Sequence, residues 1–157
     1  CELSVALFKG ARILLRQRGE KERWAGMWDF VRFTISDHLA DQIPAPPIRT
    51  RSSSGRGAVR EKQRSLFGDL EQNDSRTTFP PEVADQISQA TGLTVHACHS
   101  VAEIRHVVTR YRIRLICIRT DVVGGRILRG SGYQWRPPRD LNELPLSRTA
   151  REFAGLL

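Results

Sequence analysis

The fold is decided first by the stretch ELSVALFKGARILLR, residues 2–16. Leu3, Val5 and Leu7 recur at every second position, so they share one face of an extended strand. The tripeptide Lys9-Gly10-Ala11 can turn the chain, after which Ile13-Leu14-Leu15 returns as a second strand. The chain therefore opens with a predicted β-hairpin.

Two helices are predicted further along, one in the middle of the chain and one at its end. The first begins at Pro80-Pro81, where proline suits a helix entrance, and Gly92 ends it. The second follows Ser147, whose hydroxyl is a favourable N-cap. Each helix carries an apolar stripe at helical spacing: Val83, Ile87 and Ala90 in the first, and Ala150, Phe153, Ala154 and Leu157 in the second.

Further strands are predicted over residues 94–102 and 111–122, followed by a turn at Gly124-Gly125. Short strands are predicted at 127–128 and 133–135. The resulting order of strands, helix, strands and helix is typical of an α+β domain with a mixed sheet.

The segment from about residue 44 to residue 78 differs in composition from the rest of the chain. It is rich in Pro, Ser, Arg, Gly and Gln, and its apolar residues are too sparse to offset the entropy of ordering it. We predict a long, flexible, basic insertion within a single domain that spans residues 1–157. A loop of this length in a compact domain is unusual unless it has a function.

The charge balance indicates an anionic partner. The 157 residues include 25 Lys and Arg against 17 Asp and Glu, a net charge of +8. A small domain this basic is a candidate for binding phosphate backbones. Most of its cations are arginines, which suit bidentate contacts to phosphates and base edges, although a bias in the coding sequence explains the Arg-to-Lys ratio equally well.

The three cysteines, Cys1, Cys98 and Cys117, lack the spacing of a metal site, and we expect them to be reduced thiols of an intracellular protein. We expect a cytoplasmic protein because the chain shows no signal peptide and no apolar run long enough to cross a membrane. Because it begins with Cys1 and not with Met, we also expect it to be part of a longer protein.

Several motifs resemble the C-terminal domain of MutY-type adenine DNA glycosylases. Gly26-Met27-Trp28-Asp29-Phe30 resembles the G-L-W-E-F-P stretch of these domains and of many Nudix proteins, and residues 14–18 look like the L-L-x-x-R strand ahead of it. Trp135, residues 143–147 (ELPLS) and Arg151 resemble the family's ending, with altered spacing. The resemblance covers nearly the whole chain except the insertion, and it implies a Nudix-like mixed β-sheet sandwiched between helices.

Residues 105–110 (RHVVTR) resemble the family's loop H-x-F-(S/T)-H, which implies contact with 8-oxoguanine opposite a mispaired adenine. In 8-oxoguanine N7 is a hydrogen-bond donor, whereas in guanine it is an acceptor, and a hydroxyl can read that reversal. The resemblance makes Thr109 the discriminating residue, while Val108 replaces the aromatic residue and Arg110 the second histidine. His106 is expected to shape the loop or to contact phosphate. From the residues alone, an ordinary turn hydroxyl is the favoured interpretation of Thr109.

Arginines beside this loop, and tryptophans elsewhere in the chain that could stack on bases, are further candidates for DNA contact. Arg110, Arg112 and Arg114 alternate along one strand and are expected to form a ridge for phosphates, although a solvated strand face has the same pattern. Trp24 lies in a basic loop and is expected to be exposed, whereas Trp28 and Trp135 are expected to pack in the core.

The helix that ends at Gly92 was compared with the Nudix box, G-x5-E-x7-R-E-U-x-E-E-x-G-U. Counting back from Gly92-Leu93, its glutamate positions fall on Gln86, Gln89 and Ala90, and its arginine on Asp85. Neutral amide oxygens hold Mg²⁺ poorly, so we predict no metal site. A divergent Nudix-type nucleotide-binding or pyrophosphohydrolase domain remains the alternative function.

The resemblance also implies what this chain lacks. The family keeps its catalytic residues and its 4Fe-4S cluster in an N-terminal helical domain, so this fragment is predicted to be non-catalytic, without a cofactor, and to act with that domain on double-stranded DNA containing 8-oxoguanine:adenine pairs. The implied location is the bacterial cytoplasm, in association with the nucleoid.

The predicted insertion contains a possible second contact. Residues 63–67 (QRSLF) resemble the Q-L-S-L-F pentapeptide by which bacterial replication proteins bind the sliding clamp. Gln63, Leu66 and Phe67 would be its anchors, presented on a flexible tether. The alternatives are a chance match and a loop that packs on the domain's own surface. A third possible function is that of a protein-docking platform that acts mainly through this insertion.

Overall fold

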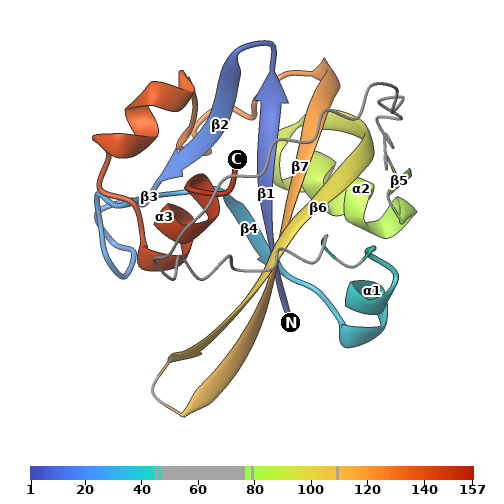
Figure 1. Ribbon diagram of the computed structural model, residues 1–157. Helices are drawn as coiled ribbons and strands as arrows, with labels where there is room; N and C mark the ends of the chain where they lie inside the picture. The colour runs from blue at the N-terminus through green and yellow to red at the C-terminus, as the bar shows by residue number, and fades with distance from the viewer. Residues whose placement is uncertain (45, 47–76, 79, 109) are drawn as a thin grey trace, which may run out of the picture.

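The computed structural model describes residues 1–44, 46, 77–78, 80–108 and 110–157. Figure 1 labels the elements along the chain. The strands in the described part are β1 (Glu2–Lys9), β2 (Arg12–Gln17), β3 (Trp28–Asp29), β4 (Val31–Thr34), β5 (Thr77–Thr78), β6 (Leu93–Val108), β7 (Tyr111–Gly125) and β8 (Tyr133–Arg136). The helices are α1 (Asp37–Asp41), α2 (Pro81–Thr91), the 3-10 helix η1 (Pro138–Asn142) and α3 (Arg148–Ala154).

The described strands form one mixed sheet around β1. This strand runs parallel to β7 and antiparallel to both β2 and β4. The sheet continues from β7 to β6 and β5 on one side, and from β2 to β3 and β8 on the other. The predicted opening hairpin is confirmed, with its turn between Lys9 and Arg12.

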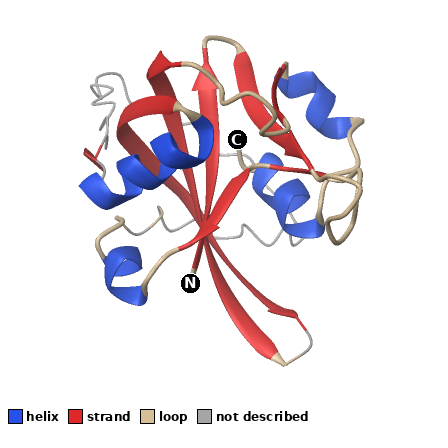
Figure 2. Ribbon diagram, turned by 180° about the vertical axis from the view of Figure 1, so that it is seen from behind, coloured by secondary structure: helices blue, strands red, loops and turns tan. Residues whose placement is uncertain are grey.

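Helices cover both faces of the sheet (Figure 2), as the α+β prediction required. Leu3, Val5 and Leu7 point to one face, where they share a core with buried residues of α1 and α2. Ala6 and Phe8 point to the other face, where the core includes Leu141 of η1 and Phe153 of α3. The period of two along β1 thus supplies side chains to both cores.

Both predicted helix boundaries are confirmed. Helix α2 has proline in its first turn and ends at Gly92, whose φ of 77° is in the left-handed region. A Cβ at Gly92 would lie 2.3 Å from the carbonyl oxygen of Arg126, so this close approach requires glycine. In α3 the Oγ of Ser147 accepts a hydrogen bond from the backbone nitrogen of Ala150, at 3.2 Å.

Three local predictions were wrong. Gly124-Gly125 is not a turn, because both residues continue β7 and pair with the start of β6. Residues 127–128 are not a strand. Backbone hydrogen bonds tie this stretch to the end of α2, from Arg126 N to Gly92 O and from Leu128 N to Thr91 O. The strand predicted over 94–102 continues to Val108, so much of the expected loop is sheet.

Most of the predicted insertion lies outside the described residues. Thr77 and Thr78, at its end, form β5 and pair with Cys98 and Ala97. The three cysteines are free thiols, and burial raises the pKa of Cys98 to about 11 and that of Cys117 to about 12. No described helix is both long and apolar enough to span a membrane.

Candidate nucleic-acid interface

The β6–β7 hairpin projects beyond the rest of the sheet (Figures 1 and 2). The pairing of β1 with β7 starts at Glu2 and Leu115, so the outer part of the hairpin lies past the end of β1. There residues 105–108 pair with residues 111–114, and in the described part of the chain these strand segments have no other strand neighbour. Four pairs at about 3.3 Å per residue give a two-stranded ribbon that extends roughly 13 Å.

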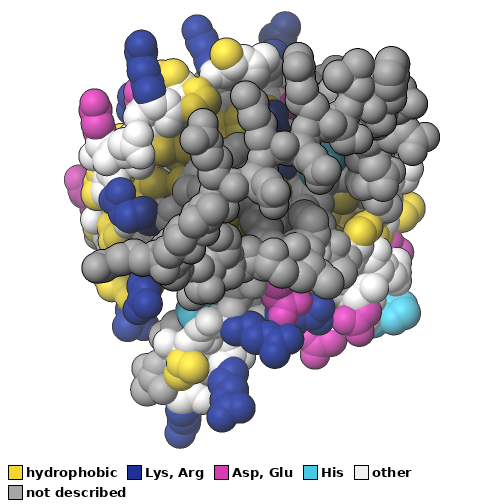
Figure 3. Space-filling model, viewed as in Figure 1, with side chains coloured by type: hydrophobic (Ala, Val, Ile, Leu, Met, Phe, Trp, Pro, Cys, Tyr) yellow, Lys and Arg dark blue, Asp and Glu magenta, His cyan; other side chains and the backbone are white. Residues whose placement is uncertain are grey.

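One face of this ribbon is basic. Arg105 pairs with Arg114 and Val107 with Arg112, which places the four side chains on the same side of the hairpin. The side chain of Val107 is 65% exposed, and Arg105 and Arg112 are also exposed. In Figure 3 Lys and Arg side chains gather on the projecting hairpin. Arg112 and Arg114 were predicted on one face from the alternation along their strand, whereas the contribution of Arg105 and Val107 to the same face was not predicted.

Carboxylates neutralise the base of this basic face. Glu103 accepts hydrogen bonds from Nε of Arg105 at 2.9 Å and from Nε of Arg114 at 3.0 Å, and these bonds lower its pKa. Arg114 also donates to Oδ1 of Asp41 at 3.0 Å, and its pKa is raised by the bonds to Asp41 and Glu103. Arg114 is therefore already held by two carboxylates, whereas Arg112, nearer the tip, is exposed.

The remaining predicted site residues lie at the hairpin tip, on the opposite face of the hairpin or outside the described residues. Arg110 lies in the turn at the hairpin tip, and Val108 ends β6. His106 lies on the face opposite Arg105, and its Nδ1 is buried with no hydrogen-bond partner in the described part of the chain. Thr109 lies outside the described residues, as do Gln63, Leu66 and Phe67 of the predicted clamp motif.

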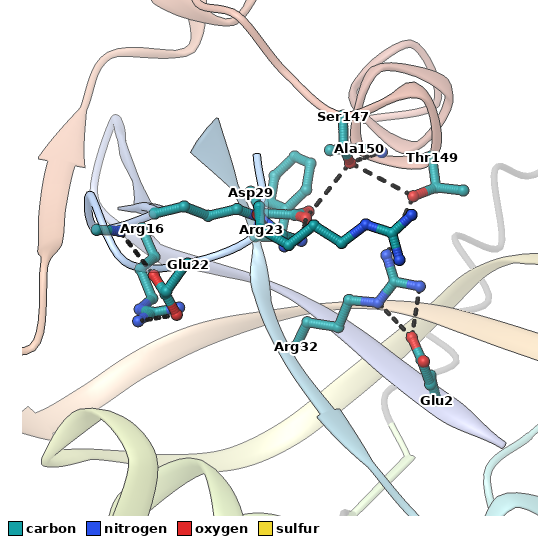
Figure 4. Close-up of polar contacts among 12 residues, drawn as sticks. Glu2, Arg16, Glu22, Arg23, Asp29, Arg32, Ser147, Thr149 and Ala150 are labelled. Atoms are coloured by element: carbon teal, nitrogen blue, oxygen red, sulfur yellow. Dashed lines mark hydrogen bonds and ion pairs between the residues drawn. The ribbon is translucent and has the colours of Figure 1, made fainter. Parts of the chain in front are cut away.

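The two motifs that resemble the family, residues 26–30 and 143–147, meet around Asp29 (Figure 4). This carboxylate is 6% exposed and accepts hydrogen bonds from Nη2 of Arg18 at 3.0 Å and from Oγ of Ser147 at 3.3 Å. Next to it, Trp28 N donates to the carbonyl of Pro145 at 2.9 Å. These motif residues therefore join β3 to the start of α3, which is a structural role.

The aromatic residues of the same motif complete this junction. The rings of Phe30 and Phe153 lie 4.7 Å apart, and the guanidinium of Arg136 covers the ring of Trp28 at 4.8 Å. Trp28 is buried and Trp135 packs, partly buried, against the core, as predicted. The predicted exposure of Trp24 is also confirmed.

A pocket of about 300 Å³ lies beside this junction. It is lined by Glu2, Arg16, Arg18, Asp29, Phe30, Arg32, Phe33, Thr34 and Tyr133. Each arginine of the pocket already has a carboxylate partner: Arg16 pairs with Glu22, Arg18 with Asp29, and Arg32 with Glu2. Guanidinium and aromatic groups suit a phosphorylated ligand, but such a ligand would have to compete with these internal ion pairs.

Helix α2 does not carry the ligands of a Nudix metal site. The positions of the glutamates hold Gln86, Gln89 and Ala90, and the carboxylates of this helix, Glu82 and Asp85, are exposed. No group of three or more His, Cys, Asp or Glu side chains within the described ranges is arranged to hold a metal ion. The donors on α2 therefore do not fit Mg²⁺, which prefers anionic oxygen ligands.

No family model matches this chain, and no curated protein matches it. Among solved structures, the MutT Nudix hydrolase from Burkholderia pseudomallei superposes with a TM-score of 0.56 at 14% identity, covering 99% of this chain and 95% of that one. The Nudix domain of Shewanella oneidensis NrtR, solved with ADP ribose, gives 0.57 at 14% identity, with 99% and 83% covered. The C-terminal domain of mouse MUTYH, solved with human PCNA, gives 0.49 at 12% identity, with 99% and 84% covered.

At these identities the similarity is one of fold. The chain has a Nudix-like fold, in agreement with the expected mixed sheet between helices. Proteins that share this fold differ in activity, so function has to be argued from the side chains.

Proposed function

We propose that this chain is the lesion-recognition domain of a MutY-type adenine DNA glycosylase, and that its β6–β7 hairpin contacts DNA containing 8-oxoguanine opposite adenine. The observation that carries the proposal is the two-stranded ribbon that projects from a sheet of Nudix-like fold, with an exposed valine, exposed arginines and no third strand beside it among the described residues. In this proposal the catalytic residues and the 4Fe-4S cluster belong to another domain of the parent protein.

The shape of the ribbon suits a groove of DNA. The major groove of B-DNA admits a two-stranded β-ribbon. An isolated two-stranded ribbon is only marginally stable in water, because few of its side chains are buried. These residues therefore add little to the stability of the fold, and contact with a partner would explain their presence. Val107 offers an apolar contact to a base, and Arg112 offers a cation to a flanking phosphate, whereas Arg105 is exposed but would have to share its charge with Glu103.

The lesion itself would be read at the tip. Thr109 lies between Val108, at the end of β6, and Arg110, in the turn. A hydroxyl at this position can accept a hydrogen bond from the protonated N7 of 8-oxoguanine, whereas N7 of guanine offers no proton. Arg112 and Arg105 would fix the register of the hairpin on the duplex without reading sequence.

Fluorescence anisotropy with a labelled duplex tests the DNA contact. We expect Arg112→Gln to weaken binding by about tenfold. The slope of log K against the logarithm of the salt concentration should become shallower by roughly one, as for the loss of one phosphate contact. The matched control is Arg12→Gln, which removes the same charge from the exposed β1–β2 turn. The control site is distant from the hairpin: Phe8, next to this turn, pairs with Asp121, which lies nine residues, or roughly 30 Å, along β7 from Arg112. Equal effects of the two substitutions would overturn the proposal.

A second candidate function is nucleotide binding, which the arginine-lined pocket favours. The internal ion pairs and the amides on α2 count against it. Isothermal titration with GDP, with and without Mg²⁺, separates the candidates. Saturable binding that is lost in Arg32→Gln would favour the nucleotide site, whereas we expect no measurable heat.

The clamp motif belongs to the same proposal as a second, tethered contact through Gln63, Leu66 and Phe67. We expect a labelled peptide of residues 60–70 to bind a bacterial sliding clamp saturably, and the absence of such binding would remove this contact from the proposal.

A further inference from the structure

The loop between β2 and β3, residues 18–27, presents an exposed tryptophan in a strained backbone conformation. Trp24 is 52% exposed, and its φ of 60° is positive, in contrast to every other non-glycine residue in the described part of the chain. Side chains with a Cβ disfavour this left-handed region, which glycine adopts without strain. Neither the burial nor the backbone at position 24 therefore accounts for a tryptophan there.

The loop is fixed by its own hydrogen bonds. Arg18 N donates to the carbonyl of Met27 at 2.9 Å, and Gly26 N donates to the carbonyl of Arg18 at 3.0 Å. Gly19 N donates to Oε2 of Glu22 at 2.7 Å. These bonds close the loop at its base and along one arm, so Trp24 lies on a loop that is held by its own hydrogen bonds.

Cations surround the indole. The guanidinium of Arg23 lies 4.7 Å from the ring centroid, and that of Arg18 lies 5.5 Å from it. Lys21 is exposed on the same loop. Of the two acidic residues of the loop, Glu22 pairs with Arg16 and Glu20 is exposed. The arrangement is a half-exposed aromatic ring with two guanidinium groups over it, of which Arg18 also pairs with Asp29. A base or sugar next to a phosphate would pack on the exposed part of the ring, with Arg23 free to face the phosphate.

The loop and the hairpin leave the sheet at the same end. Strand β2 is antiparallel to β1, so its last residue, Gln17, lies toward the start of β1. The start of β1 pairs with Leu115 of β7, where the hairpin begins to project. In Figures 1 and 2 the connection from β2 to β3 and the projecting hairpin accordingly lie toward the same side of the molecule.

We propose that the loop of residues 18–27 is a second DNA contact, in which the indole of Trp24 packs on a base or deoxyribose and Arg23 faces the adjoining phosphate. This inference rests on the proposed function, because it takes DNA as the partner of the hairpin. Stacking on an aromatic ring depends little on base identity. The loop therefore adds affinity for damaged and undamaged duplexes alike, while the hairpin discriminates between them.

The test substitutes Trp24→Gly, which removes the indole and relieves the positive φ. We expect affinity for lesion and undamaged duplexes to fall by about five- to tenfold each, without a fall in melting temperature. Trp24→Phe keeps an aromatic ring and should retain most of the affinity. The matched control is Val123→Thr, which changes an exposed apolar side chain (57% exposed) near the opposite end of β7.

The outcomes separate the two proposals. If Arg112→Gln weakens binding while Trp24→Gly binds like wild type, the loop contact is overturned and the hairpin proposal stands. If Trp24→Gly lowers the melting temperature, the indole is a packing residue and the loop contact is likewise overturned. If the wild-type chain binds neither duplex, both proposals fall.

Discussion

At the scale of single residues, Asp29 is the side chain on which the junction of the two motifs depends. It accepts hydrogen bonds from Arg18, from Ser147 and from the backbone nitrogen of Phe30. Ser147 in turn caps α3, so one buried carboxylate links the β3–β4 connection to the C-terminal helix. A buried charge that serves several donors is costly to remove, because its partners lose their acceptor together.

We therefore expect Asp29→Asn to lower the free energy of unfolding by about 2 kcal/mol, since the ion pair with Arg18 is largely buried. Urea denaturation followed by far-ultraviolet circular dichroism measures the change. The control is Glu22→Gln, which weakens a more exposed ion pair with Arg16 and the bond from Gly19 N and should cost much less than Asp29→Asn. Similar losses in both variants would contradict the role given to Asp29.

At the scale of the element, the β6–β7 hairpin uses some of its arginines in internal ion pairs and leaves Arg112 exposed. Glu103 bridges Arg105 and Arg114 across the two strands, and these hydrogen bonds lower its pKa from the ordinary value of 4.5. A lowered pKa means that the ionised carboxylate favours the folded state. Its contribution is present above pH 4.5 and is lost as the pH falls through the lowered value.

Glu103→Gln should therefore remove part of the acid-side loss of stability, so that the unfolding midpoints of variant and wild type converge as the pH falls through the lowered pKa of Glu103. Because Glu103 is partly exposed and its partner Arg105 is mostly exposed, the difference at neutral pH should stay below about 1 kcal/mol. Thermal melts from neutral to acidic pH measure it. A constant difference in melting temperature between the two proteins across that range would show that ionisation of Glu103 is not coupled to folding.

The hairpin also shows where sequence patterns reach their limit. The two strands were predicted, but the strand over 94–102 was ended too early because residues 105–110 were interpreted as a loop from their resemblance to the family's motif. Pairing with β7 keeps residues 103–108 extended. Gly124-Gly125 is a turn signal in sequence, yet Gly125 serves a close approach: a Cβ there would lie 2.2 Å from the carbonyl oxygen of Gly92.

At the scale of the whole molecule, the fold was predictable because its boundary signals are local. The opening hairpin, the end of α2 at Gly92 and the cap at Ser147 each follow from a few adjacent residues. The site was predictable only in part, because its electrostatics depend on contacts between distant residues. Arg114, predicted as part of an open ridge, meets Asp41, 73 positions away, and only the folded chain brings the two together.

The net charge of +8 made a polyanionic partner plausible, but only the arrangement of side chains in space assigns parts of that charge to the hairpin and to the loop of residues 18–27. The central claim is that the hairpin tip reads 8-oxoguanine, and an NMR titration of the chain tests it most directly. Two duplexes, one with 8-oxoguanine and one with guanine opposite adenine, would be compared at one salt concentration. The account predicts larger amide shifts over residues 107–112 with the lesion, and loss of that difference in Thr109→Ala. Equal, salt-sensitive shifts with both duplexes would contradict lesion reading by this hairpin.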